Sequence, residues 1–172
     1  EWLSEKRGKK VRLLTPERGE KRRLRELAQR NAEESYRQRG QRKQSRSNLL
    51  VELQERLRLP RFPHRIECFD ISNVQGQLTV GSMVVLSDGE PAKQEYRRYH
   101  IKTVVGADDY ASLNEVLKRR LERGVAEGCL PDMILIDGGK GQLGVLVDVI
   151  REMGLSDQIG AVGIAKSRVL SN

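Results

Sequence analysis

The chain has 172 residues, a mass of 19.6 kDa and a formal charge of +8, so it can bury one sizeable core. No apolar run approaches the roughly 18 residues that span a bilayer, which argues against a membrane protein. Its two cysteines, Cys68 and Cys129, form no CxxC pair, which argues against a disulfide framework or a zinc site. Because the N-terminus shows no signal-peptide pattern, we expect a soluble, cytoplasmic protein.

The positive charge is concentrated in the first third of the chain. Residues 1–65 hold 20 Lys and Arg against 9 Asp and Glu, a net of +11, whereas residues 66–172 hold 12 against 15, a net of −3. Such a segment favours a polyanionic partner over a small-molecule substrate. Lys21, Arg22 and Arg23 are therefore candidates for DNA contact, although a basic run of this kind is also typical of a solvated helix face.

The first of two expected domains, residues 1–62, is predicted to be a basic segment with a short strand and a long helix. In chain order its parts are a strand-like run at 11–14, a helix at 15–42, a low-complexity break at 40–48 and a second helical stretch at 49–59. Thr15 and Pro16 are typical of an N-cap and a first helical position, although Gly19 is compatible with a later start. Two prolines end the helical pattern at the domain boundary.

The second expected domain, residues 63–172, follows the apolar period of strands from Arg65 onward. It begins with three strands at 65–71, 79–86 and 93–102. A helix at 108–124, a strand at 133–136, a helix at 142–153 and a strand at 159–165 follow. Asp88-Gly89 is typical of a hairpin turn between the second and third strands. The first helix has core spacing at Tyr110, Leu113, Val116, Leu117 and Leu121.

This βββαβαβ order resembles the opening of the ribonuclease H-like fold, an α/β class with a mixed sheet flanked by helices, here preceded by a basic helical segment. In that fold the fourth strand lies beside the first. Two apolar runs of this chain carry an aspartate at their ends, Asp70 on the first strand and Asp137 on the fourth. We therefore expect the two carboxylates to be neighbours.

Two neighbouring carboxylates repel each other, and a shared divalent cation relieves that repulsion. Oxygen ligands favour Mg²⁺ or Mn²⁺, and a metal site of this kind activates water and stabilises the leaving oxygen of a phosphodiester. The spacing alone leaves a second interpretation open, in which each aspartate caps a turn. Asp70 would then serve Ser72 and Asn73, and Asp137 would serve the Gly-Gly pair that follows it.

Two further sets of residues are candidates for contact with nucleic-acid phosphates. Lys140 lies in the glycine-rich stretch 138–141 between a strand and a helix, where backbone N–H groups approach phosphates, although a tight turn explains the glycines equally well. No Walker frame fits this stretch. Arg97 and Arg98 lie in an aromatic and basic cluster at 96–99, which suits either a nucleic-acid backbone or a solvated strand face.

Three other residue positions have plainer interpretations. Asp108 and Asp109 precede a predicted helix, where an acid is usually a cap. His64 and His100 have no partner at ligand spacing and are expected to be structural or surface residues.

Several long strings occur in one order, RIECFDISNVQG, DGEPAKQEYRRY, ADDYASL and ILIDGGKGQL. Together with the basic opening EWLSEKRGKKVRLLTPERGEKRRLRELAQRNA, they resemble the C-terminal half of the UvrC family, the incision subunit of the bacterial UvrABC excision nuclease. The resemblance implies an endonuclease that makes the 5′ incision beside a lesion in nucleotide excision repair, within the SOS response to DNA damage. It implies catalytic roles for Asp70, Asp137 and Asp109, with Mg²⁺ or Mn²⁺ held by Asp70 and Asp137.

The resemblance also implies partners, which are damaged double-stranded DNA, UvrB, and UvrA through the UvrB–DNA complex. The family uses a histidine in a later segment and further domains on both sides, so the chain is expected to be a fragment. A second class of function stays open, a non-catalytic DNA-binding or docking module with the same fold. A nucleotide-binding P-loop protein is disfavoured by the missing Walker frame.

Overall fold

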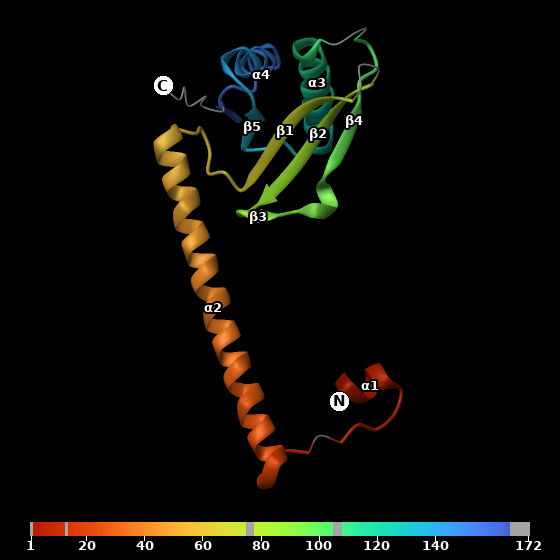
Figure 1. The fold of residues 1–172 in the computed structure, drawn as a ribbon, viewed down its shortest axis with the longest axis vertical. Coiled ribbons are helices and arrows are strands. Elements are labelled where there is room, and N and C mark those ends of the chain that lie inside the picture. Colours follow the sequence, from red (N-terminus) through yellow and green to blue (C-terminus); the bar gives the residue numbers. More distant parts are fainter. Residues whose placement is uncertain (1, 13, 75–77, 105–107, 166–172) are drawn as a thin grey trace, which may run out of the picture. The chain divides into compact units, whose positions relative to one another are not determined.

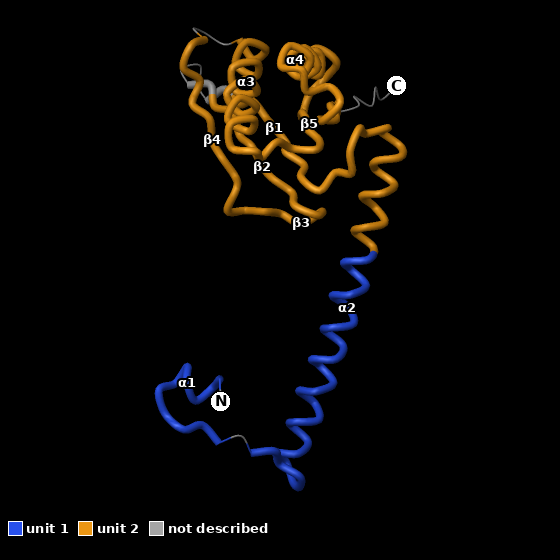
Figure 2. The backbone as a smooth tube through the Cα atoms, turned by 180° about the vertical axis from the view of Figure 1, so that it is seen from behind, with its two compact units in different colours: residues 1–44 blue, residues 45–172 orange. Residues whose placement is uncertain are grey.

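The computed structural model describes residues 2–12, 14–74, 78–104 and 108–165. It divides the chain into two compact units, Glu1–Gln44 and Ser45–Asn172, coloured blue and orange in Figure 2. The division falls inside one long helix, earlier than the boundary expected between residues 62 and 63. None of the helices in the described part of the chain combines the length and apolar character that crossing a membrane requires.

The N-terminal unit begins with a short helix, α1 (Trp2–Arg7), and not with the expected strand. The prediction of a strand at 11–14 was wrong for the described residues 11, 12 and 14, while Leu13 lies outside them. A lone strand leaves its backbone groups without a ladder, and here the Val11 N–H donates to the hydroxyl of Ser4 at 2.9 Å.

The long helix α2 (Gly19–Leu57) is continuous, so the break predicted at 40–48 was also wrong. It starts at Gly19, where φ is +69°, after the Thr15-Pro16 pair. The stretch 40–48 is mostly Gln, Arg, Lys and Ser, which are tolerated or favoured in helices, and its one glycine costs only about 1 kcal/mol. Exposed pairs such as Arg22–Glu26 at 2.7 Å add small increments.

The second unit is built on a mixed sheet, which the described residues form from six strands. Figure 1 labels most of them. The strands are β1 (Arg65–Val74), β2 (Leu78–Ser87), β3 (Glu90–Pro91), β4 (Arg97–His100), β5 (Met133–Asp137) and β6 (Gly160–Ile164). Their order is β3-β2-β1-β5-β6. Strand β4 pairs with the same edge of β2 as β3 does, but with the earlier residues 80–83. The predicted α/β class, with the strand of Asp137 parallel to and beside the strand of Asp70, is confirmed.

The predicted third strand is interrupted. The hairpin turn at Asp88-Gly89 is confirmed, with φ of +49° and +75°, values that suit a two-residue turn between β2 and β3. After Pro91 the chain makes a 3₁₀ turn at Lys93–Glu95 and only then returns to β2 as β4.

Two helices, α3 (Asp109–Glu127) and α4 (Lys140–Glu152), cover one face of the sheet (Figure 1). The main core lies between them and the sheet, and includes Phe69, Leu113, Leu117, Ile134 and Leu146. Of the predicted core positions on α3, Tyr110 was wrong, because it is 54% exposed at the first turn of the helix.

The other face of the sheet is only partly covered. Leu50 of α2 and Leu59 after it pack on Ile66 and Met133, near the start of β1 and β5. Because side chains alternate along a strand, Ile66, Cys68 and Asp70 point to this face while Glu67 and Phe69 point to α3 and α4. The carboxyl ends of β1 and β5 thus carry the exposed part of this face.

Candidate active site

Asp70 and Asp137 occupy matching positions on two adjacent parallel strands. The ladder between β1 and β5 pairs Cys68 with Leu135 and Phe69 with Ile136, and the next residue on each strand is one of the two aspartates. Strands paired in this way lie about 4.8 Å apart, and the ladder ends one residue before the two aspartates. Both aspartates are exposed. The structure therefore brings together the two acids that lie 67 positions apart in the sequence.

The turn-cap interpretation does not suit Asp70. Strand β1 continues four residues past it, to Val74, so no turn follows Asp70 directly. The carboxylate accepts a hydrogen bond from the hydroxyl of Ser72 at 2.9 Å, and its backbone carbonyl accepts one from Ser82 at 3.3 Å. These contacts orient Asp70 on the exposed face and leave it in the middle of a strand.

Asp137 stands at a strand-to-helix connection. It is the last residue of β5 and pairs with Ile164 of β6, and the following Gly138 donates its N–H to the carbonyl of Ile164 at 3.0 Å. Helix α4 begins three residues later at Lys140, which is exposed. Its N-cap is Gly139, whose lack of a side chain leaves the helix N-terminus without a side-chain cap.

Asp109 lies at the same end of the sheet, because the side chain of its neighbour Tyr110 reaches the start of α4. A Cβ at Gly141 would lie 2.7 Å from the Tyr110 hydroxyl, so the tip of this side chain on α3 lies against the start of α4. The N-cap of α3 is Asp108, whose carboxylate accepts from the Ala111 N–H at 2.9 Å. The capping role expected of Asp108 or Asp109 therefore belongs to Asp108, and Asp109 is the half-buried first residue of the helix.

Arg97 and Arg98 are neighbours in sequence but lie on opposite faces of the sheet. Arg98 pairs with Ser82, which pairs with Asp70, so all three point to the exposed face. Arg97 pairs with Met83, which belongs to the core under α3. Only one of the two predicted DNA contacts therefore shares a face with Asp70.

Sequence reasoning missed a residue on this face, His100. It pairs with Val80, which pairs with Ser72, two residues beyond Asp70 on β1. His100 is exposed. The signal was present in the sequence, because His100 follows Arg98 by two positions and the period of a strand places both on one side.

The remaining predicted DNA contacts lie in the N-terminal unit. Lys21, Arg22 and Arg23 are exposed in the first turns of α2, and Arg22 is paired with Glu26.

The described residues contain no group of three or more His, Cys, Asp or Glu side chains that could hold a metal ion. Two exposed carboxylates at one sheet edge nevertheless fit a magnesium or manganese site. Mg²⁺ in particular is usually held by one or two carboxylates, with water and substrate phosphates completing its shell. The oxygen donors of Asp70 and Asp137 match that preference.

Comparisons with known proteins find similarity over the whole chain. The family model "UvrC RNAse H endonuclease domain" matches residues 54–172, and the model "UvrC Ribonuclease H-like domain" matches residues 1–39. UvrABC system protein C of Syntrophotalea carbinolica is 62% identical over all of this chain, and that of Anaeromyxobacter dehalogenans is 47% identical over 98% of it. The chain spans 28% and 25% of the lengths of these two relatives.

Among solved structures the similarity is distant. The catalytic domain of human Endonuclease V is 22% identical, with a TM-score of 0.44. The alignment covers 71% of this chain and 58% of the Endonuclease V chain.

Proposed function

The chain belongs to the UvrC family, and we propose that residues 63–172 form a metal-dependent DNA endonuclease core that makes the 5′ incision in nucleotide excision repair. Residues 1–62 are the basic segment that precedes this core. The observation that carries the proposal is the matching position of Asp70 and Asp137 on adjacent parallel strands, at the exposed end of one sheet face.

Asp70 and Asp137 would hold Mg²⁺ or Mn²⁺, and the bound ion would supply an activated water and a positive charge for the leaving oxygen of the cleaved phosphodiester. Ser72 orients the Asp70 carboxylate through its hydroxyl. Asp109, at the same edge, adds negative charge near the start of α4. A positioning role for Asp109 agrees with its place in the first turn of α3, where an acid favours the positive end of the helix.

Basic residues on and near this face would bind the DNA backbone. Arg98 and His100 lie two strands from Asp70 on the same face, which is about 10 Å at the spacing of strands. Lys140 extends the basic character to the other side of the acids. Lys21, Arg22 and Arg23 would add contacts from the basic segment. The substrate is damaged double-stranded DNA, delivered by UvrB after loading by UvrA.

The test of the catalytic assignment is incision of lesion-containing duplex by the full-length protein together with UvrA and UvrB. Asp70→Asn and Asp137→Asn should each abolish the 5′ incision and leave the 3′ incision intact. Asp148→Asn is the matched control, because Asp148 is an exposed acid on α4 that pairs with Arg151. Normal 5′ cutting by either of the first two variants would overturn the assignment.

Metal binding is tested separately by thermal unfolding in Mn²⁺. A cation that binds only the folded state must raise the midpoint, and the rise should disappear in Asp70→Asn. The alternative function, a non-catalytic docking module, predicts no rise in the wild type and undiminished incision by both aspartate variants. The position of Asp70 within a strand, away from any turn, favours the nuclease over that alternative.

The backbone contacts are tested by measuring duplex affinity at several salt concentrations. Arg98→Gln should weaken binding and reduce the slope of log affinity against log salt by about 1, as expected for one lost phosphate contact. His100→Ala should weaken binding, whereas His64→Ala should not, because His64 lies at the other end of β1 beside Asp88. Equal effects of the two histidine variants would contradict a role for His100.

A further inference from the structure

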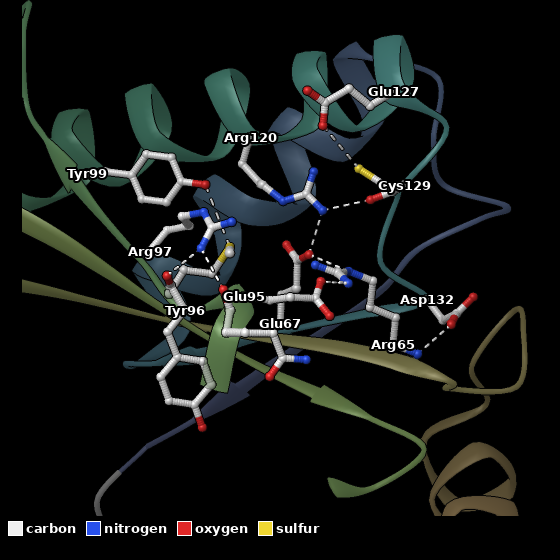
Figure 3. Close-up of polar contacts among 12 residues, drawn as sticks. Arg65, Glu67, Glu95, Tyr96, Arg97, Tyr99, Arg120, Glu127, Cys129 and Asp132 are labelled. Carbon is white, nitrogen blue, oxygen red and sulfur yellow. Dashed lines mark hydrogen bonds and ion pairs between the residues drawn. The ribbon is translucent and has the colours of Figure 1, made fainter. Parts of the chain in front are cut away.

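A second polar site lies beneath α3, on the opposite face of the sheet from Asp70. Here a cavity of about 100 Å³ is lined by four arginines, Arg65, Arg97, Arg120 and Arg123, and by the carboxylates of Glu95 and Glu127. Figure 3 shows most of these side chains converging from β1, β4 and α3. Arg65 precedes Asp70 by five residues, roughly 17 Å along a strand, and the cavity is on the other face of the sheet.

The innermost charges of this site balance one another. Glu67 is fully buried, and its Oε1 accepts from Arg65 Nε at 2.8 Å and from Arg120 Nη2 at 2.6 Å. Arg120, only 4% exposed, also donates to the carbonyl of Cys129 at 2.7 Å, and Arg65 donates to Glu95. Two arginines and two glutamates thus form a fixed, neutral base to the cavity.

Arg97 adds a positive charge that no carboxylate of the described residues neutralises through an ion pair. Its Nη1 donates to two backbone carbonyls, of Gln94 at 3.0 Å and Tyr96 at 2.9 Å, as Figure 3 shows for Tyr96. These two bonds use both hydrogens of Nη1 and hold the guanidinium in place while Nη2 and Nε keep their hydrogens for another acceptor. Arg97 is therefore a preorganised donor at the wall of the cavity.

Arg123 brings a second outer guanidinium from α3. Its Nε donates to Glu127 at 2.8 Å, and both side chains are largely exposed, so the pair is weak and open to competition. With Glu127 balancing Arg123, the cavity as a whole keeps the single excess charge of Arg97. An anion that enters would meet guanidinium groups from two directions, β4 and α3.

We propose that this cavity binds a single phosphate group. Its volume of about 100 Å³ leaves room for one small oxyanion. Planar guanidinium groups are the side chains best suited to a phosphate, because each offers two parallel donors. The phosphate is either free inorganic phosphate or a phosphate of a nucleic-acid backbone, since both present the same oxygens.

The test is calorimetric titration of the full-length protein with inorganic phosphate at constant ionic strength, without DNA or metal. The wild type should give saturable binding. Arg97→Gln should weaken it at least tenfold, because a hydrogen bond between charged groups contributes more than the 1.4 kcal/mol that equals a factor of ten. Arg151→Gln removes an equal charge from an exposed pair on α4 and should change nothing.

A substitution that should raise phosphate affinity, instead of lowering it, makes the test specific. Glu127→Gln removes a negative charge from the wall and releases Arg123, so phosphate affinity should rise. A merely structural role of these side chains would not produce changes of opposite sign. No saturable binding by the wild type, or equal affinity in Arg97→Gln and the wild type, would overturn the proposal. Arg123→Gln serves as a second loss variant if Arg97→Gln lowers the thermal midpoint.

Duplex affinity of the same variants identifies the source of the phosphate. If a DNA phosphate enters the cavity, Arg97→Gln lowers duplex affinity and reduces its salt slope by about 1. If free phosphate is the ligand, duplex affinity stays at the wild-type value. The incision expected of the Asp70 variants does not depend on either result. The phosphate proposal and the proposed nuclease function can therefore fail independently.

Discussion

Replacing Glu115 by glutamine should destabilise the protein by about 3 kcal/mol at neutral pH. Glu115 on α3 holds residues 102 and 103, which follow β4. Its carboxylate accepts the N–H of Lys102 at 2.9 Å, the N–H of Thr103 at 2.9 Å and the hydroxyl of Thr103 at 2.7 Å, and Arg119 donates to it at 3.0 Å. Glutamine keeps one acceptor oxygen but replaces the other by an amide that meets donors.

The magnitude follows from the pKa of this carboxyl group. Burial works to raise the pKa of Glu115, but the hydrogen bonds from Thr103, Lys102 and Arg119 outweigh it and lower the pKa from 4.5 to about 2. The side chain is only 9% exposed, so solvent screens these bonds little. A difference of 2.5 pKa units corresponds to about 3 kcal/mol of preference for the ionised form in the folded state.

The sign of the pH dependence follows from the same values. Because the folded pKa is below the unfolded one, this stabilisation is complete above pH 4.5 and is lost as the pH falls towards 2. The difference between the wild type and Glu115→Gln should therefore be about 3 kcal/mol at pH 7, roughly half that at pH 3, and close to zero at pH 2.

The assay is urea unfolding of both proteins at these pH values, with Glu122→Gln as the control because Glu122 is an exposed acid on the same helix. Titration of the other carboxyl groups is common to both proteins and cancels in the difference. A difference below 1 kcal/mol at pH 7, or one that stays constant down to pH 3, would show that these hydrogen bonds do not stabilise the ionised carboxylate of Glu115.

Two further substitutions test the packing beside the two polar sites. Arg120→Met leaves the buried carboxylate of Glu67 with Arg65 alone, and it should cost about 3–5 kcal/mol in urea unfolding; replacing Glu67 by leucine in the same protein should recover part of that loss. Gly141→Ala would set a Cβ 2.7 Å from the Tyr110 hydroxyl, so the exposed Tyr110 ring must turn aside and the alanine should not raise stability. Gly144→Ala, on the same helix with no atom within 4 Å, should raise stability slightly, and similar effects of the two alanines would contradict the contact.

The elements of the second unit could be predicted because their signals are local. Strand periodicity located β1, β2, β5 and β6, and Asp88-Gly89 marked a hairpin turn whose conformation requires residues that tolerate positive φ. The N-terminal unit was predicted less well. A run such as 11–14 has strand propensity, but a strand forms only where another strand completes its hydrogen bonds.

The candidate catalytic pair was also within reach of the sequence. Each aspartate ends or interrupts an apolar run, and the order of strands and helices made the two strands neighbours. The register of the ladder, which sets Asp70 beside Asp137, depends on contacts over the whole length of both strands. It became visible only in the folded chain.

Local signals in the sequence located most strands and helices of the second unit and the acids that interrupt or end its apolar strands, because periodicity and turn chemistry act between residues a few positions apart. The tertiary structure alone decided which side chains meet. Arg120 reaches Glu67 across 53 positions, and Arg97 and Arg98 separate to opposite faces. An acid at a core-facing position predicts that some cation must neutralise it, but only the packing of α3 on β1 selects Arg120, since charges pair by distance in space and not along the chain.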